Sequence, residues 1–427
     1  MHVNTAWSQR QHLSFLGKLL LVTFIIAGCS EPEPPAPNIV TPPPAETTEA
    51  DTQSAENLQA LATALVVAVS ATSQALSEKA HHFAKNPTNE SLAELKSAWG
   101  SAHRDLTRAN ILFALADTSP ALFGALESHR FNLDAEPIQP GFIDRFGVYE
   151  QSGIVNDISL PLNATHLREQ HGLTDKSDIA LGIHALEFLI WGDTPRTLDD
   201  FVKRSLPKEM EASGLRVVDL PENRRREYIR LSAQMLADDA SALEAAWQAV
   251  LRLQLEQLQP LARLQIWHGA GQTYWNQYVL QPWISATGEY PPLVASDLPE
   301  QVAIATALTS DTTSTSQLPE EFKQNRFANL GADLFAQQLS VLKSTYLDSG
   351  LGKAVLTPDS LLQLNSSMDK ANQMVKQLRE RQKDQPHPQD WPWRDEALNK
   401  RLVSLCQDIH IALQDMPPLP HQGGGAY

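Results

Sequence analysis

The chain has 427 residues, of which 42% are hydrophobic and 20% are charged. Its 34 Lys and Arg residues against 50 Asp and Glu residues give a formal net charge of −16. This balance argues against nucleic acid as a partner, because no basic surface is available to displace counterions from phosphates. The two cysteines are too few for a multi-cysteine metal site or a disulfide framework. The length exceeds the roughly 250–300 residues at which single cores stop growing, so we predict two domains or a repeated unit.

The first 28 residues have the pattern of a secretory signal. They include Arg10 and Lys18 and no acidic residue, and the uncharged run LLLVTFIIAG leads to Cys29. This run is too short to span a bilayer, and a positive flank before a short apolar run is typical of a signal peptide. The residues Ile-Ala-Gly-Cys at 26–29 resemble the bacterial lipobox, whose cysteine is lipidated. We expect Cys29 to anchor the protein at the periplasmic face of the cell envelope, with Ser30 favouring the outer membrane over the inner one. The alternative is an uncleaved anchor with an incidental cysteine.

A proline-rich, acidic segment follows at 29–53. Seven prolines occur between Glu31 and Pro44, and almost no apolar residue accompanies them. Such a composition cannot bury a core, so we expect an extended tether between the lipid and the globular part.

From Ser54 onward the apolar residues recur at helical spacing almost throughout. Ser91 and Glu94 have the spacing of a capping box. A loop of about thirty residues runs to about residue 160, and loops of this length in compact domains usually serve a function or cover something. We predict helices over 54–85, 91–117, 121–128, 176–191, 222–258, 319–347, 357–383 and 394–415.

The predicted fold class is all-α, because no segment alternates at period two over more than a few residues. Two helical, four-helix-bundle-like domains fit the pattern best, and we interpret them as an internal duplication. The predicted layout is a lipoprotein signal peptide at 1–28, a linker at 29–53, a first bundle at 54–285, a linker at 286–318, a second bundle at 319–416 and a disordered tail at 417–427.

The helix expected near residue 184 is apolar on nearly every face, which predicts burial. Its two strongly polar side chains are His184 and Glu187, at positions i and i+3 on one side of the helix. A buried carboxylate needs a partner. Either an arginine of a neighbouring helix pairs with Glu187 while His184 bonds a backbone carbonyl, or the pair chelates a metal. In the second case further ligands must come from other helices or from the long loop.

The segment 182–192, GIHALEFLIWG, resembles the G-x-H-x-x-E signature of the imelysin family. The helix around Trp99 resembles an early helix of that family, and the stretch from Arg225 to Trp247 resembles the long helix after its signature. The resemblance extends from residue 54 to about 415. It implies an envelope protein, often a lipoprotein, with two four-helix bundles and the signature at or near their interface. It also implies a role for His184 and Glu187 at a metal.

Members of that family have been classed as metallopeptidases and linked to iron uptake or regulation. No His-Glu dipeptide occurs in this sequence, so it has no His-Glu-x-x-His helix to place two zinc ligands beside a general base. Whether the protein is an enzyme therefore stays open at this point.

Other positions bear on the metal hypothesis. His103 and Arg104 follow Trp99 by one turn and are candidates for a supporting shell around His184, or for a structural network. Relatives often have a glutamate where this chain has Asn110, which would remove a carboxylate ligand. In the second half, His410 has Leu413 at i+3 and therefore lacks the pair.

Three hypotheses follow. The first is an envelope-anchored, imelysin-like lipoprotein that binds a metal ion, iron or zinc, and serves iron uptake or regulation with other envelope iron-uptake proteins. The second is a zinc-dependent metallopeptidase of the imelysin type with an unidentified base. The third is a helical adaptor without a metal, whose groove binds a partner protein and whose His184 and Glu187 lock the core.

Overall fold

The computed structural model describes residues 47–136, 138–211, 214–282, 331–383 and 396–415. In these ranges the chain forms helices joined by loops and no β-strand, with one isolated bridge between Phe146 and Tyr149. The prediction of an all-α fold is confirmed. The described helices belong to one compact unit. The signal peptide, Cys29 and the proline-rich linker up to residue 46 lie outside the described residues, as does the tail at 417–427.

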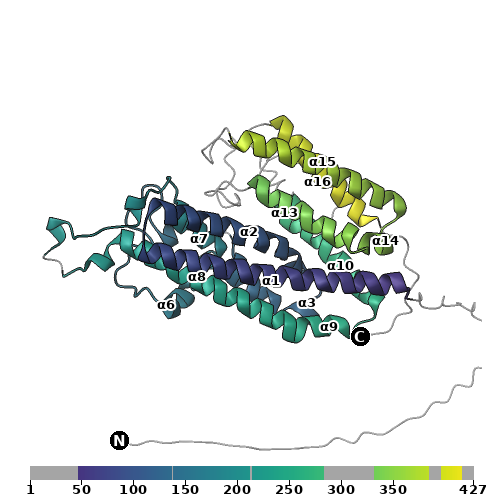
Figure 1. The fold of residues 1–427 in the computed structure, drawn as a ribbon, viewed down its shortest axis with the longest axis horizontal. Helices are drawn as coiled ribbons and strands as arrows, with labels where there is room; N and C mark the ends of the chain where they lie inside the picture. The colour runs from purple at the N-terminus through teal and green to yellow at the C-terminus, as the bar shows by residue number, and fades with distance from the viewer. Residues whose placement is uncertain (1–46, 137, 212–213, 283–330, 384–395, 416–427) are drawn as a thin grey trace, which may run out of the picture. The chain divides into compact units, whose positions relative to one another are not determined.

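Helix α1 (Glu49–Lys85) packs along α2 (Asn89–Thr118) and α8 (Pro221–Ala246), as Figure 1 shows. Its apolar stripe, including Leu58, Leu65 and Val69, is buried as the spacing predicted. Both α1 and α2 begin before the predicted residue. The α2 cap is Thr88 instead of Ser91: the Thr88 hydroxyl accepts a hydrogen bond from the Ser91 amide over 3.1 Å, so Ser91 lies in the first turn.

By length and composition, α1 is the one helix in the described ranges that could cross a membrane. Core helices of globular proteins share this length and composition. Here the stretch is partly buried against its neighbours, and Leu58 and Val66 are inaccessible to solvent.

The predicted helix at 222–258 is three successive segments. After α8 come a π-helical segment (Trp247–Leu251) and α9 (Arg252–Glu256). Helix α10 (Pro260–Thr273) continues into a second π-helical segment (Tyr274–Leu280) and packs on α1 and α2. The aromatic residues of this region belong to the core, with Trp267, Tyr274 and Trp275 buried.

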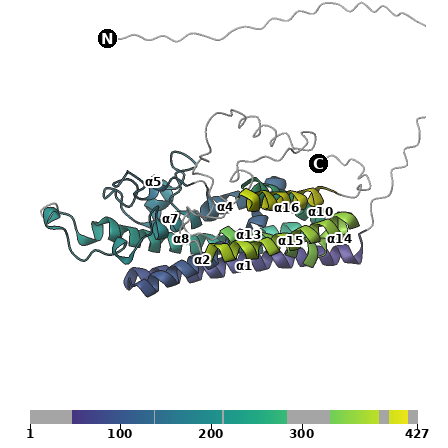
Figure 2. The ribbon, with the colours of Figure 1, turned by 90° about the horizontal axis from the view of Figure 1, so that it is seen from above.

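The second half contains α13 (Gly331–Lys343), a π-helical segment (Ser344–Asp348), α14 (Leu351–Val355), α15 (Pro358–Lys383) and α16 (Glu396–Gln414). Figure 2 shows α15 beside α16 and α13. Cys406 is free and buried, and burial raises the pKa of its thiol. Helix α13 of the predicted second bundle packs on α2 of the predicted first bundle, as α10 also does. The two predicted bundles are therefore in contact. The linker predicted at 286–318 lies outside the described residues, and the two-bundle division and the duplication stay predictions.

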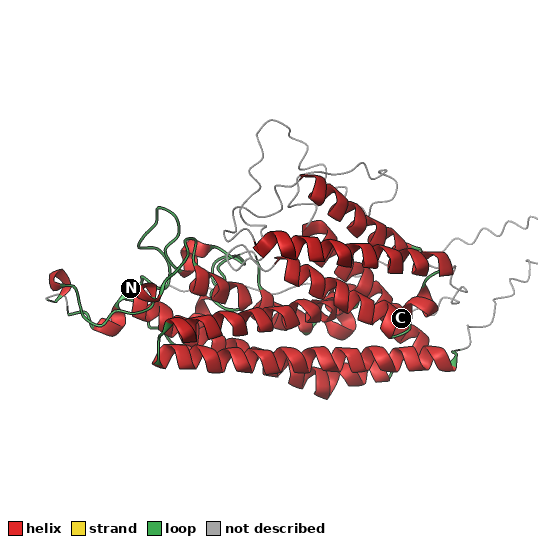
Figure 3. Cartoon of the chain, turned by 45° about the horizontal axis from the view of Figure 1, so that its top comes forward, coloured by secondary structure: helices red, strands yellow, loops and turns green. Residues whose placement is uncertain are grey.

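Short helices replace most of the predicted long loop. Helices α3 (Pro120–Phe123) and α4 (Leu126–Asp134) stand where one helix at 121–128 was predicted. Helices α5 (Pro140–Ile143) and α6 (Ala164–Gln170) follow, and α5 packs on α7 (Ile183–Trp191). Three 3₁₀ turns, at Leu198–Asp200, Lys208–Met210 and Val217–Asp219, lead into α8. Figure 3 shows the loops that join these short elements gathered at one end of the long helices.

Helix α7 carries the signature and is shorter than predicted, because it begins at Ile183 instead of residue 176. Its N-cap is Gly182, whose φ of 95° lies outside helical conformation. Every residue from Ile183 to Ile190 is buried, which confirms the predicted burial of this helix. His184 is therefore the second residue of a short buried helix.

Candidate metal centre

Gly182 lets the end of α4 lie directly against the start of α7. A Cβ atom at this position would be 3.1 Å from the carbonyl oxygen of Leu133, and the backbone conformation at φ 95° and ψ 179° is one that only glycine adopts readily. Asp134, the last residue of α4, is thereby brought opposite His184. The close approach of α4 and the positive φ together explain why a glycine occupies the first position of the signature segment.

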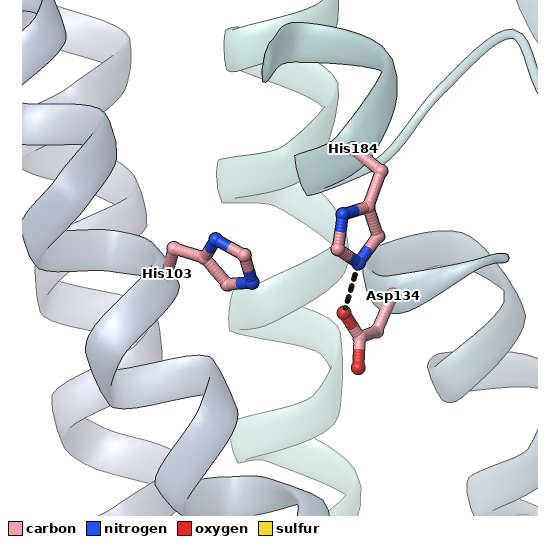
Figure 4. A group of neighbouring side chains, drawn as sticks. All are labelled: His103, Asp134 and His184. Atoms are coloured by element: carbon pink, nitrogen blue, oxygen red, sulfur yellow. Dashed lines mark hydrogen bonds and ion pairs between the residues drawn. The ribbon is translucent and has the colours of Figure 1, made fainter. Parts of the chain in front are cut away.

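Two carboxylates face the Nε2 atom of His184. Oδ1 of Asp134 and Oε1 of Glu136 each lie 3.0 Å from it, and Figure 4 marks the bond to Asp134. Neither residue was predicted from the sequence. The available signal was a pair of acids flanking Ala135 at the start of the long region between α4 and α7. The hypothesis that His184 bonds a backbone carbonyl is wrong, since its Nε2 pairs with carboxylates.

His103 of α2 is the third member of the cluster. Its imidazole ring lies edge-on to that of His184, with ring centroids 5.1 Å apart at an angle of 84°. One ligand atom each from His103, Asp134 and His184 lie within 4.8 Å of one another, and the three side chains point toward a common space in Figure 4. In the part of the chain that the structure describes, this is the one group of three or more such side chains close enough to share an ion.

The other predicted site residues lie beside this cluster. Glu187 is 2% exposed, and its Oε2 atom is 3.9 Å from Nδ1 of His184, on the ring edge away from the contacts of Nε2. Arg104 forms an ion pair with Asp333 of α13 at 3.9 Å. The supporting residue predicted beside His103 therefore reaches toward the second half of the chain.

The charges around the cluster set its protonation. Burial lowers the pKa of His184, but the charge of Glu136 and hydrogen bonding to Asp134, Glu136 and Glu187 outweigh burial and raise this pKa well above its usual value. Burial, reinforced by the charge on His184, lowers the pKa of His103 to about 3. His103 is therefore a neutral imidazole with a lone pair, and His184 carries the proton that balances the acids.

Of the arginines that open α8, Arg224 and Arg225 are buried and Arg226 is half-buried. Arg225 is held by the buried carboxylate of Asp144, with Nη2 3.1 Å from Oδ1, and Arg196 contacts the same carboxylate at 2.8 Å. Arg224 donates to the carbonyl oxygen of Val155 over 2.9 Å, and Arg226 donates to that of Phe201 over 2.6 Å.

Aromatic side chains frame the cluster. Trp99 donates from Nε1 to the carbonyl oxygen of Ile183 over 2.9 Å, and its ring lies 4.8 Å from that of His103 and 4.9 Å from that of Trp191. Tyr228 donates to the carbonyl oxygen of Ala180 over 2.7 Å. Helix α2 therefore packs against the start of α7.

Two further histidines, His268 of α10 and His410 of α16, lie in other surroundings. His268 is buried, and its Nδ1 atom is 3.0 Å from the Tyr346 hydroxyl. Burial lowers the pKa of His268 to about 4 and lowers that of His410.

Comparisons with known proteins bear on the family and the fold of this chain. A family model described as imelysin, peptidase M75, matches residues 60–414. Among solved structures, the chain is similar to a Parabacteroides distasonis protein that is provisionally named iron-regulated protein A precursor. The TM-score is 0.52 at 13% identity, covering 87% of this chain and 95% of that chain, so the likeness concerns the fold alone. A search of proteins with curated descriptions found no match. Because the family model spans most of the sequence, the chain belongs to the imelysin family.

Proposed function

We propose that this protein is an envelope-anchored member of the imelysin family that binds one iron ion through His103, Asp134 and His184. Glu136, whose Oε1 atom lies 3.0 Å from Nε2 of His184, lies beside this donor set at its more exposed edge. The observation that carries the proposal is the convergence of two imidazoles and a carboxylate from three different helices on one space.

The donor types suit iron. Two histidines and one carboxylate with further positions open are the ligand set typical of non-haem iron(II) sites. Two atoms bound to one ion at about 2.1 Å cannot be further apart than about 4.2 Å. The donor atoms here lie within 4.8 Å of one another, so closure by roughly half an ångström would seat an ion.

The charge balance also favours a cation. Asp134, Glu136 and Glu187 surround His184, and the side chains of Asp134 and Glu187 are 12% and 3% exposed. Burying several carboxylates without positive charge is costly. The proton on His184 compensates one of them, and a bound cation would replace that proton and compensate more.

Exposure defines the side from which an ion reaches the centre. The Glu136 side chain is 36% exposed, whereas that of His184 is 7% exposed and His103 is 4% exposed. Glu136 is therefore the carboxylate that contacts both solvent and the buried imidazole of His184.

The cellular setting rests on the N-terminal sequence. The lipobox at Cys29 and the proline-rich linker would hold the domain near the membrane, on the periplasmic face and more readily at the outer membrane. Family membership and the name of the Parabacteroides relative connect this setting with iron. We propose a role in iron uptake or sensing beside other envelope iron-uptake proteins.

Metal analysis of the purified protein tests the proposal. The wild-type chain, loaded anaerobically with iron(II) or with zinc and then desalted, should retain about one ion per chain. His184→Ala and Asp134→Asn should retain much less. His81→Ala, which changes an exposed histidine near the end of α1, is the matched control and should behave as wild type. Equal metal content in all four proteins would contradict the proposal.

A further inference from the structure

The two ring nitrogens of His184 face different carboxylates. Nε2 lies 3.0 Å from both Asp134 and Glu136, whereas Nδ1 is the atom nearest to Glu187, at 3.9 Å. The two nitrogens of an imidazole point away from each other in the ring plane. An ion held at Nε2 between Asp134 and His103 would therefore lie across the ring from the contact with Glu187.

The position of Glu187 is fixed by its own helix. It lies one turn after His184 on α7 and is almost completely buried, so the two side chains are neighbours on the same side of one helix. The N–H group of a neutral imidazole is a suitable donor for such a carboxylate. Closing the gap from 3.9 Å to hydrogen-bond distance takes about 1 Å.

His103 provides the contrast. Its Nδ1 atom is buried and has no hydrogen-bond partner within the described residues. Of the two histidines in the cluster, His184 is thus the one with a carboxylate beside its second nitrogen. Histidines that bind metals almost always donate that second N–H to a carboxylate, a carbonyl or a water, which sets the tautomer and the ring orientation.

We infer that Glu187 is a positioning residue: its carboxylate holds the His184 ring with Nδ1 protonated and Nε2 presented to the ion, and does not itself bind the ion. This inference rests on the proposed function. It assigns different roles to the histidine and the glutamate of the signature.

The test compares Glu187→Gln and Glu187→Leu with Asp134→Asn, using cobalt(II) as the probe. Cobalt(II) absorption reports the number and type of ligands, and titration gives the affinity. Both Glu187 variants should bind one cobalt ion per chain with the wild-type spectrum. Their affinity should fall by about 10–100-fold, the usual cost of losing such a partner. Glutamine keeps an acceptor oxygen, so its loss should be smaller than that of leucine. Asp134→Asn should change the spectrum itself.

Two results would overturn the inference alone. The first is a spectrum of Glu187→Gln that changes as that of Asp134→Asn does, because Glu187 would then be a ligand. The second is wild-type affinity in both Glu187 variants. A wild-type chain that binds no cobalt would instead overturn the proposed function, and the inference with it. Glu187→Gln is nearly isosteric, so it keeps the comparison valid if Glu187→Leu unfolds.

Discussion

Asn110 donates a hydrogen bond from Nδ2 to Oδ2 of Asp134 over 2.8 Å, while the other oxygen of the same carboxylate faces His184. The absence of a glutamate at position 110 suggested a lost ligand. The structure instead has a carboxylate from α4 at this place, and Asn110 orients it. The cluster therefore contains a carboxylate, but this carboxylate comes from a different helix.

Asn110→Ala should weaken metal binding without abolishing it. The substitution removes the hydrogen-bond donor that orients Asp134. Loss of a residue that hydrogen-bonds a metal ligand typically costs about 10–100-fold in affinity. The free energy of unfolding without metal should fall by about 1 kcal/mol, the net value of one hydrogen bond. Titration with cobalt(II) and chemical denaturation measure the two effects. An affinity equal to that of wild type would show that Asp134 needs no such support.

Gly182→Ala should lower both stability and metal affinity. Alanine at φ 95° and ψ 179° costs about 1–3 kcal/mol, and its Cβ would press on the Leu133 carbonyl and move α4 away from His184. Chemical denaturation and metal titration test this. Gly147→Ala is the control, because that glycine also has a positive φ, of 57°, yet a Cβ there meets nothing within 4 Å. The control should lose some stability and keep its metal affinity.

Asp144→Asn should destabilise the fold while leaving the metal centre intact. It removes the charge that Arg225 and Arg196 share in a buried position, and breaking a buried ion pair costs about 3–5 kcal/mol. Thermal unfolding should show a large loss, whereas metal content measured well below the unfolding temperature should equal that of wild type. A variant that is folded but has lost its metal would show that the ion pairs of Asp144 and the metal centre are coupled.

Acid should reduce stability in part through His268. Burial lowers the folded-state pKa of this residue to about 4, below the value of 6.5 in an unfolded chain, so folding favours the neutral imidazole. Its contribution is complete above about pH 6.5 and is lost as the pH falls toward 4, by up to about 3 kcal/mol. Chemical denaturation at several pH values measures the slope. His268→Gln should flatten the slope over this range, while His81→Gln, at an exposed position, should not.

Much of the fold follows from local pattern. The apolar spacing in α1 located the helix to within a few residues, and the composition of 183–190 predicted its complete burial. Two of the errors fell where one residue's conformation decides a boundary. The φ of Gly182 starts α7 seven residues late, and the Thr88 hydroxyl starts α2 two residues early.

The sequence by itself determined the helical class, the family signature and the neighbouring placement of His184 and Glu187, because a helix turn sets that spacing without help from the rest of the chain. Tertiary structure alone decided which groups surround this pair. Asp134 lies fifty residues before His184 and is brought to it by the close packing of α4 on Gly182. His103 arrives from α2 on the other side. Contacts of this kind depend on how helix ends and loops pack, and local periodicity carries no information about that packing.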